Sequence, residues 1–339
     1  MMTDAQSKTL TPEWLAHRYD PTTDTIQFVD VDRATRAHVP FLTDENLGVL
    51  PPTIVRRSDV SVPPEARSDV RYIFHSAYCC STLLANAYDR PGLSFSLKEP
   101  VIFNDIVGWR HRSGTPAQLG AVLGDAVRLL ARPFVPGERC IIKPSNVVNG
   151  FAPALLGGRD DVKALLLHAP LRVYLGSIAS KGLWGRLWVR DLLSKQLQEG
   201  FVDLDFTAQD YFRQSDLQVA AVGWLAQHAL FAKLAAAMPT RVRTLNSEAL
   251  LANPEQSLAA LDDFFGVADN AAGRGGIISS IFSRNAKSGE KFDASNRIAV
   301  QITASELHGD EIDKVLAWAE TVADGAGISM TLSSPLLTG

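Results

Sequence analysis

Cysteine is scarce in this sequence, which limits the class of protein that it can encode. Only 3 of the 339 residues are cysteines, at positions 79, 80 and 140. Three thiols cannot form the disulfide framework of a small secreted domain, and the adjacent pair Cys79 and Cys80 is a poor candidate for a disulfide. We therefore expect three reduced thiols and a cytoplasmic protein.

The sequence also lacks the usual signals for a membrane, a metal or a nucleic acid. Its N-terminus does not show the charged-then-apolar order of a signal peptide, and no unbroken apolar run reaches the roughly 18 residues that span a bilayer. No Cys/His cluster has the spacing of a zinc site. Because 33 basic residues face 37 acidic ones, the net charge of −4 gives no general attraction to nucleic acid. We expect no metal, no nucleic-acid partner and no membrane span.

The composition is that of a globular protein with a large core, since 46% of the residues are hydrophobic and 21% are charged. Residues 1–68 differ from the rest: a short helix is expected to begin at Pro12, a strand covers residues 25–31, and prolines recur as far as Pro63-Pro64. We interpret residues 1–68 as an N-terminal extension with a proline-rich connection, and residues 69–330 as the main α/β domain.

From residue 70 onward, apolar strand patterns alternate with helical patterns. The expected strands cover residues 71–75, 94–98, 139–143, 162–168 and 241–245. The expected helices cover residues 81–89, 101–111, 116–131, 147–156, 170–182, 186–198, 216–237, 254–265, 273–283 and 303–324. This alternation predicts an α/β fold with a mainly parallel central sheet flanked by helices. In such sheets ligands bind beyond the carboxyl ends of the strands.

The loop after the first of these strands has the layout of a phosphate-binding loop. A strand, Tyr72–Phe74, enters a loop of small residues, and Ser81 and Thr82 then begin a helix. Backbone N–H groups at a helix N-terminus attract an anion, and the two hydroxyls add donors. We therefore expect Ser81, Thr82 and the loop residues that precede them to bind a phosphate group. The loop residues are Ser76, Cys79 and Cys80. An ordinary strand–turn–helix with a Ser/Thr start is the alternative.

This loop lacks the glycine and lysine that a Walker A motif places before its Ser/Thr, because Cys79 and Cys80 occupy those positions. Hydrolysis of ATP or GTP is therefore a poor interpretation. A loop that ends Ser-Thr-Leu-Leu without Gly-Lys resembles that of the sulfotransferase family. In that family a variant P-loop holds the 5′-phosphosulfate end of PAPS, 3′-phosphoadenosine-5′-phosphosulfate. The resemblance implies a P-loop-type nucleotide-binding architecture and PAPS as co-substrate, with no metal.

Further segments extend the resemblance over roughly residues 70–295. His168-Ala-Pro170 and Ser177 are similar to the family's Arg-Asp-Pro and following Ser, which grip the 3′-phosphate. Here His168 replaces the arginine and the spacing is one residue longer, so Arg172 would supply the charge. Residues 245–255, which include Asn253-Pro254, are similar to the family's Tyr-Glu-x-Leu-x-x-Asn-Pro segment. The basic segment 283–291 stands where the family has its Arg/Lys-Gly loop, which implies Arg284 and Lys287 near the 3′-phosphate.

Glu99 is the best candidate for the general base, because it follows the second expected strand at the edge where ligands bind. Lys143, after the third strand, would replace the missing loop cation, and His75 is an alternative base. The alternatives are a structural ion pair between Lys98 and Glu99, and a solvated Lys143.

The resemblance implies sulfuryl transfer to a hydroxyl or amine of a small molecule or glycan. A P-loop kinase and a non-catalytic nucleotide- or anion-binding protein remain alternatives. The sequence does not indicate the acceptor or the oligomeric state.

Overall fold

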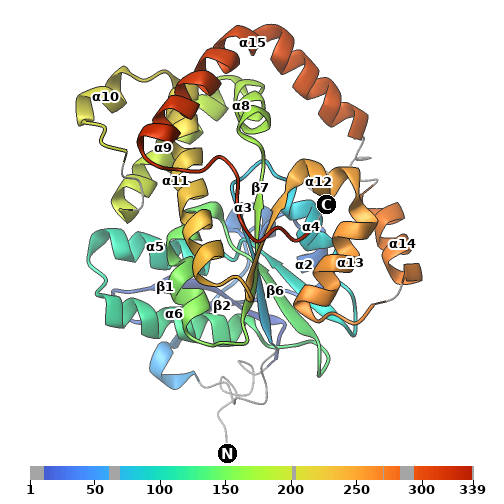
Figure 1. The fold of residues 1–339 in the computed structure, drawn as a ribbon. Helices are drawn as coiled ribbons and strands as arrows, with labels where there is room; N and C mark the ends of the chain where they lie inside the picture. The colour runs from blue at the N-terminus through green and yellow to red at the C-terminus, as the bar shows by residue number, and fades with distance from the viewer. Residues whose placement is uncertain (1–10, 61–68, 201–203, 270, 283–293, 338–339) are drawn as a thin grey trace, which may run out of the picture. The chain divides into compact units, whose positions relative to one another are not determined.

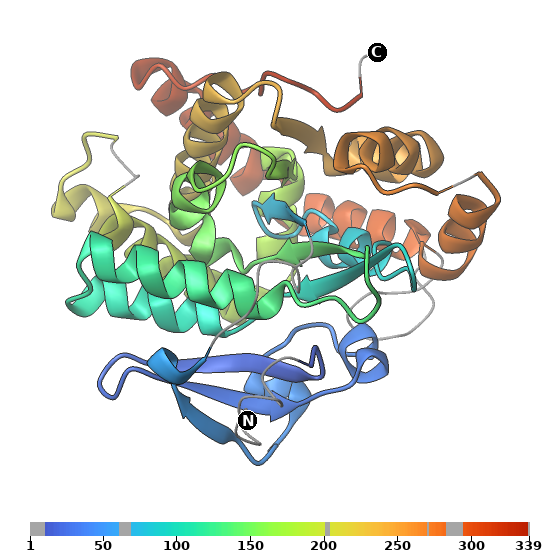
Figure 2. The same ribbon diagram turned by 90° about the horizontal axis from the view of Figure 1, so that it is seen from below.

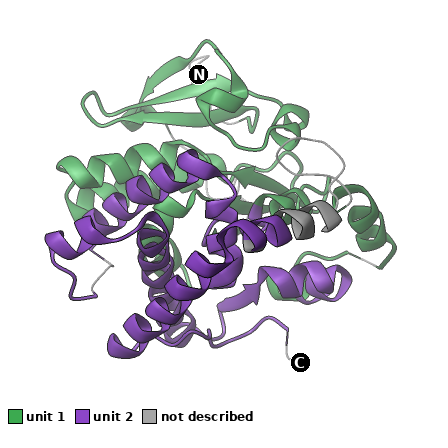
Figure 3. Cartoon of the chain, turned by 90° about the horizontal axis from the view of Figure 1, so that it is seen from above, with its two compact units in different colours: residues 1–74, 82–164, 261–290 green, residues 75–81, 165–260, 291–339 purple. Residues whose placement is uncertain are grey.

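A computed structural model of the chain describes residues 11–60, 69–200, 204–269, 271–282 and 294–337. The chain forms two compact units, which Figure 3 shows in two colours. Unit 1 comprises Met1–Phe74, Thr82–Ala164 and Leu261–Glu290. Unit 2 comprises His75–Ser81, Leu165–Ala260 and Lys291–Gly339.

The predicted α/β fold with a parallel central sheet flanked by helices is confirmed (Figure 1). The sheet consists of β4 (Val70–His75), β5 (Ser94–Lys98), β6 (Arg139–Lys143), β7 (Lys163–His168) and β8 (Val242–Asn246). Its spatial order is β5-β6-β4-β7-β8, so the strand order reverses at β4. Each strand lies within two residues of its expected bounds, because a strand covered on both faces appears in the sequence as a continuous apolar run. The reversal places the loop after β4 at the position where open α/β sheets bind ligands.

A second, antiparallel sheet forms from the N-terminal residues in the order β1-β2-β3. Its strands are β1 (Trp14–Asp20), β2 (Thr25–Asp30) and β3 (Thr53–Arg56). The strand expected at residues 25–31 is confirmed as β2, but the helix expected to begin at Pro12 is wrong. Thr11 and Pro12 look like a helix start, yet β1 pairs with β2 along its length, and this pairing overrides the local preference.

The helices of unit 1 include α5 and α6, which contact β1 (Figure 2). The helices up to β7 are α2 (Arg33–His38), α3 (Asp44–Leu47), α4 (Ser81–Asn86), α5 (Ile102–Arg112), α6 (Pro116–Leu130) and α7 (Ala152–Gly157). Two 3₁₀ turns, η1 (Arg57–Asp59) and η3 (Asn146–Phe151), lie among them. The single helix expected at residues 147–156 is therefore wrong in part, since a 3₁₀ turn with Gly150 precedes α7 and Pro153 stands in its first turn.

Unit 2 is mostly helical around α11. Its helices are α8 (Leu171–Ala179), α9 (Gly182–Glu199), α10 (Ala208–Arg213), α11 (Asp216–Ala237), α12 (Ser247–Ala252) and α15 (Ala294–Gly325). Of the other two helices, α13 (Pro254–Phe265) has residues in both units, and α14 (Ala271–Ile281) belongs to unit 1. A capping box of Ser215 and Gln218 begins α11 at its expected residue. By length and composition α11 is apolar enough to cross a membrane, but 72% of its most apolar window is buried, as in a core helix.

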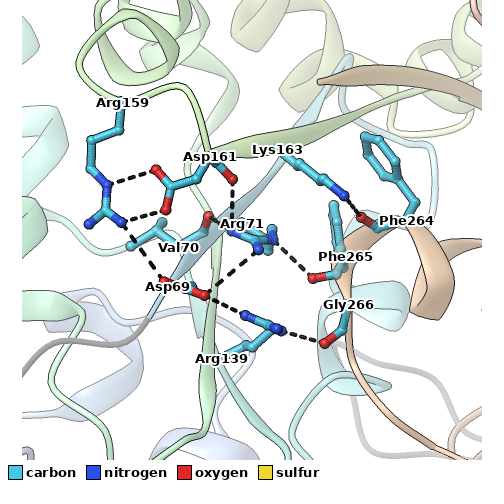
Figure 4. Close-up of polar contacts among 10 residues, drawn as sticks. All are labelled: Asp69, Val70, Arg71, Arg139, Arg159, Asp161, Lys163, Phe264, Phe265 and Gly266. Atoms are coloured by element: carbon cyan, nitrogen blue, oxygen red, sulfur yellow. Dashed lines mark hydrogen bonds and ion pairs between the residues drawn. The ribbon is translucent and has the colours of Figure 1, made fainter. Parts of the chain in front are cut away.

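Three basic side chains at the start of sheet strands hold the C-terminal end of α13 (Figure 4). Arg71 Nε donates to the Phe265 carbonyl at 3.0 Å, and Lys163 Nζ donates to the Phe264 carbonyl at 2.8 Å. Arg139 donates to the carbonyl of Gly266, whose φ of +71° is the left-handed conformation that glycine adopts most easily. These contacts satisfy carbonyls that a helix end leaves without partners.

We predict that Arg71→Met destabilises the fold by about 2–3 kcal/mol, because buried carbonyls then lose a charged hydrogen-bond donor. Arg71 is 6% exposed and contacts three backbone carbonyls. Urea denaturation measures the change. The control is Arg159→Met, because Arg159 pairs with Asp161 at the surface and should cost less than about 1 kcal/mol. Equal losses for both variants would contradict this account.

Candidate active site

The loop between β4 and α4 reaches its conformation without glycine. β4 ends at His75 and α4 begins at Ser81, as the sequence predicted. Ala77, Tyr78 and Cys80 have φ values of +70°, +51° and +61°, in the left-handed region that non-glycine residues avoid. Each such residue costs about 1–3 kcal/mol, and such strain clusters at functional sites.

Hydrogen bonds within unit 2 hold this loop in place. The backbone N–H of Ser76 donates to the Leu167 carbonyl at 3.1 Å, and Ser76 Oγ accepts from the N–H of Ala169 at 3.1 Å. The loop is thereby tied to the carboxyl end of β7. The N–H of Ala77 donates to Nδ1 of His75 at 3.0 Å, so the ring's lone pair at Nδ1 is already used. This geometry favours Glu99 over His75 as a base.

The hydroxyls predicted to bind phosphate lie on both sides of a unit boundary. Ser76 and Ser81 belong to unit 2 and Thr82 to unit 1, and all three residues are buried. Cys79 is buried and Cys80 is partly exposed; both are thiols without a disulfide.

Unit 1 brings Glu99 and Lys143 together. In the parallel pair β5–β6, Lys98 lies opposite Lys143, and the backbone N–H of Glu99 donates to the Lys143 carbonyl at 2.7 Å. The ammonium of Lys143 donates to the carboxylate of Glu99. The side chain of Lys143 is 1% exposed, whereas that of Glu99 is 19% exposed. A proton acceptor that solvent can reach therefore lies beside a buried cation, so Lys143 is not a solvated surface lysine.

Lys98 does not pair with Glu99, although the two are neighbours in the sequence. Its ammonium donates to the Ala37 carbonyl and to Oδ1 of Asn86, each at 2.8 Å. Burial lowers the pKa of Lys98 to about 8. The structural alternative for Glu99, an ion pair with Lys98, is therefore wrong, since its partner is Lys143.

At the end of β7, His168 lies in a second cluster of unit 2. Its ring lies 5.7 Å from that of His228, which stacks on Trp224 at 4.3 Å. Burial lowers the pKa of His168 to about 4. The same cause, with the nearby His168, lowers the pKa of His228 to about 4. At neutral pH the predicted 3′-phosphate residue His168 is therefore an uncharged hydrogen-bonding group.

The other residues predicted for the 3′-phosphate have protein partners. The exposed Arg172 forms an ion pair with Asp313 of α15. Ser177 Oγ donates to the Val173 carbonyl at 2.8 Å and accepts from Gln301 Nε2 at 3.1 Å. Arg284 and Lys287 lie outside the described residues.

Several neighbours of these residues were not among the residues that the sequence analysis singled out. Phe41 lies under the ammonium of Lys143, with 5.0 Å between Nζ and the ring centroid. Tyr78, in the loop itself, lies 5.5 Å from the ring of Trp188 and 6.0 Å from that of Tyr174. An aromatic residue inside a loop of small residues was a visible signal for Tyr78, whereas Phe41 and Gln301 come from segments far away in the sequence.

The chain matches no protein-family model and no curated protein. Among solved structures it is similar to a sulfotransferase domain from the curacin biosynthetic pathway, with 14% identity, a TM-score of 0.45, and coverage of 80% of this chain and 94% of that one. It is also similar to a sulfotransferase domain from the Synechococcus PCC 7002 olefin synthase, with 13% identity, a TM-score of 0.40, and coverage of 74% and 98%. These values establish neither a family nor an activity, so the functional argument rests on this chain's own residues.

We predict that the two histidines make the fold sensitive to acid. Their folded-state pKa values of about 4 lie below the ordinary 6.5, so the unfolded chain binds more protons between these values. The free energy of unfolding should therefore fall as the pH falls from about 6.5 to about 4. His228→Gln should make this pH dependence shallower by about 1 kcal/mol per pH unit.

Urea denaturation at several pH values between 4 and 7 measures the effect. The same exchange at the exposed His38 is the control. If the free energy of unfolding of His228→Gln has the same pH dependence as that of the wild type, burial does not destabilise the charged form of the His228 ring, and the prediction is contradicted.

Proposed function

We propose that this chain is a PAPS-dependent sulfotransferase that acts on a hydroxyl or amine of a small molecule or glycan. The observation that carries the proposal is the Glu99–Lys143 pair at the carboxyl ends of two neighbouring parallel strands. That edge is where α/β sheets bind ligands, and the pair combines a proton acceptor with a cation. The glycine-free loop after β4, with the buried hydroxyls of Ser81 and Thr82, supports the proposal.

The described residues fit the two ends of PAPS unequally. Ser81, Thr82 and the loop amides offer hydrogen-bond donors to the 5′-phosphosulfate. At the 3′-phosphate, Arg172 would have to leave Asp313, an exposed pair whose net stabilisation is small. Ser177 would have to turn away from the Val173 carbonyl. We therefore expect recognition of the 3′-phosphate to be weaker than that of the 5′ end.

PAPS supplies the sulfuryl group, which passes to the acceptor oxygen or nitrogen while 3′,5′-phosphoadenosine leaves. Glu99 takes the proton from the acceptor group, which becomes a stronger nucleophile. Lys143 stabilises negative charge that develops on the transferred and leaving oxygens, and so replaces the cation that the loop lacks. The remaining requirement is alignment of the reacting groups.

Calorimetry with 3′,5′-phosphoadenosine and with 5′-AMP tests the cofactor. We expect both to bind, with 3′,5′-phosphoadenosine about tenfold tighter, because one charged hydrogen bond stabilises binding by about 1.5–3 kcal/mol. Arg172→Gln should remove most of this difference, whereas Arg213→Gln, an exposed arginine of α10, should not.

If the wild type binds 3′,5′-phosphoadenosine and 5′-AMP with equal affinity, the proposed 3′-phosphate site is contradicted. That result would favour a general nucleotide- or anion-binding protein. Release of 3′,5′-phosphoadenosine from PAPS with a panel of alcohol, phenol, amine and glycan acceptors then tests turnover. Turnover of ATP with Mg²⁺ in place of PAPS would contradict the proposal and favour a kinase.

A further inference from the structure

The first two turns of α9 present apolar side chains to solvent. Leu183, Trp184 and Leu187 are 71%, 61% and 58% exposed, and Trp188 is partly exposed. Residues three and four positions apart are neighbours on a helix surface, so these four side chains form one continuous surface, the α9 apolar face. The helix also packs on α11 and α8 (Figure 1). Because a soluble protein rarely exposes large apolar side chains side by side, this face indicates a ligand or a partner.

Ion pairs lie beside the α9 apolar face on the same helix. They are Arg186–Glu311, Arg190–Asp216 and Asp191–Lys195. Lys181, just before the first turn of α9, is exposed to solvent, where water screens its charge. The face therefore favours an apolar ligand over an ionic one.

Ring contacts connect the α9 apolar face to the loop after β4. Trp184 and Trp188 lie nearly parallel, with 13° between their planes and 6.5 Å between their centroids. Trp188 meets Tyr78 of the loop edge to face, with 89° between the planes and 5.5 Å between the centroids. Both α9 and this part of the loop, His75–Ser81, belong to unit 2. The three rings therefore form a continuous aromatic strip from the loop to the exposed side of α9.

Tyr78 makes this contact from an unfavourable backbone conformation. Its φ of +51° lies in the left-handed region that glycine adopts easily and that bulky residues avoid. The turn itself does not require an aromatic side chain, so strain at Tyr78 indicates a function for its ring. Burial raises the pKa of Tyr78 to about 12, so the phenol is uncharged at neutral pH. The end of the strip that lies in the loop is therefore a neutral aromatic ring.

We propose that the acceptor is an elongated apolar molecule, with an alkyl or aryl tail on the α9 apolar face and its hydroxyl or amine at Tyr78. This inference rests on the proposed function, in which the loop after β4 holds the 5′-phosphosulfate. The acceptor's hydroxyl or amine loses its proton and gains the sulfuryl group, and 3′,5′-phosphoadenosine leaves. The tail removes the apolar surface of Trp184 and Leu187 from water, which drives binding.

Two features favour this acceptor over a second copy of the chain. A second copy packed on α9 would cover the exposed side chains but would not explain the strained Tyr78 at the other end of the strip. The α9 apolar face also consists of only four side chains, whereas a stable interface buries about 800 Å² per partner, contributed by about 20–30 residues.

Calorimetry without PAPS tests the apolar site, with p-butylphenol as an aryl probe, n-octanol as an alkyl probe and maltotriose as a polar one. We expect saturable binding of at least one apolar probe and none of maltotriose. Trp184→Ala should weaken binding about tenfold and Leu187→Ala about threefold, because each removes apolar contact area. Both side chains are exposed, so both variants should fold. Phe212→Ala, at an exposed phenylalanine of α10, is the matched control and should not change the affinity.

A turnover assay separates this inference from the proposed function. With PAPS and an apolar acceptor, Trp184→Ala should raise KM about tenfold and leave kcat nearly unchanged, because the tail contact is the same in the ground state and the transition state. Binding at the α9 apolar face without turnover of PAPS would contradict the proposed function and leave the face as an apolar ligand site. Turnover with glycans alone, without binding of either apolar probe, would keep the function and overturn this inference.

Three further results would overturn the inference. The first is the absence of saturable binding of both apolar probes to a protein whose circular dichroism shows that it is folded. The second is probe binding that Trp184→Ala and Phe212→Ala change equally, which would indicate non-specific contact. The third is a dimer in analytical ultracentrifugation that Trp184→Ala dissociates, which would assign the α9 apolar face to a second copy of this chain.

Discussion

The side chain of Lys143 is almost completely buried, and its ammonium group forms an ion pair with the carboxylate of Glu99. Burial of an unpaired ammonium would be costly, so the pair constrains both strand ends. The parallel register of β5 and β6 sets Lys98 opposite Lys143, and the chain must then turn so that Glu99 can reach the ammonium. Glu99 does this with a φ of +51°, a strained conformation for a non-glycine residue. The positions of Glu99 and Lys143 in the candidate active site therefore depend on this ion pair.

In the loop after β4, as at Glu99, hydrogen bonds hold residues in strained backbone conformations. Three left-handed non-glycine residues are held by hydrogen bonds from Ser76 to the end of β7 and by the ring of His75. A P-loop of the Walker type uses glycine for this geometry and lysine for the charge. In our proposal, backbone ties replace the glycine and Lys143 replaces the lysine.

The sheet could be predicted from the sequence because its strands are buried on both faces, and the start of α11 could be predicted because Ser215 and Gln218 form a capping box. Strand β1 could not be predicted, because the sequence at Pro12 resembles a helix start and only pairing with β2 makes the segment a strand. The partner of Glu99 was also missed: sequence proximity suggested Lys98. β5 ends at Lys98, and Glu99 then turns with a φ of +51° toward Lys143 of the neighbouring strand, whereas Lys98 donates to the Ala37 carbonyl and to Asn86. Contacts between segments that are far apart in the sequence, such as that between Phe41 and Lys143, can be identified only from the three-dimensional structure.

The most direct measurement is the PAPS turnover rate of wild type, Glu99→Gln, Lys143→Met and the double variant, per folded molecule. If the pair is catalytic, each single change should lower kcat by about 10²–10⁴. The double variant should be little worse than the poorer single variant, because groups that act as a unit are not additive. If the pair is only structural, the single variants should lose stability, by about 3–5 kcal/mol where Lys143 is left unpaired. A double variant that turns over at the wild-type rate would contradict our account.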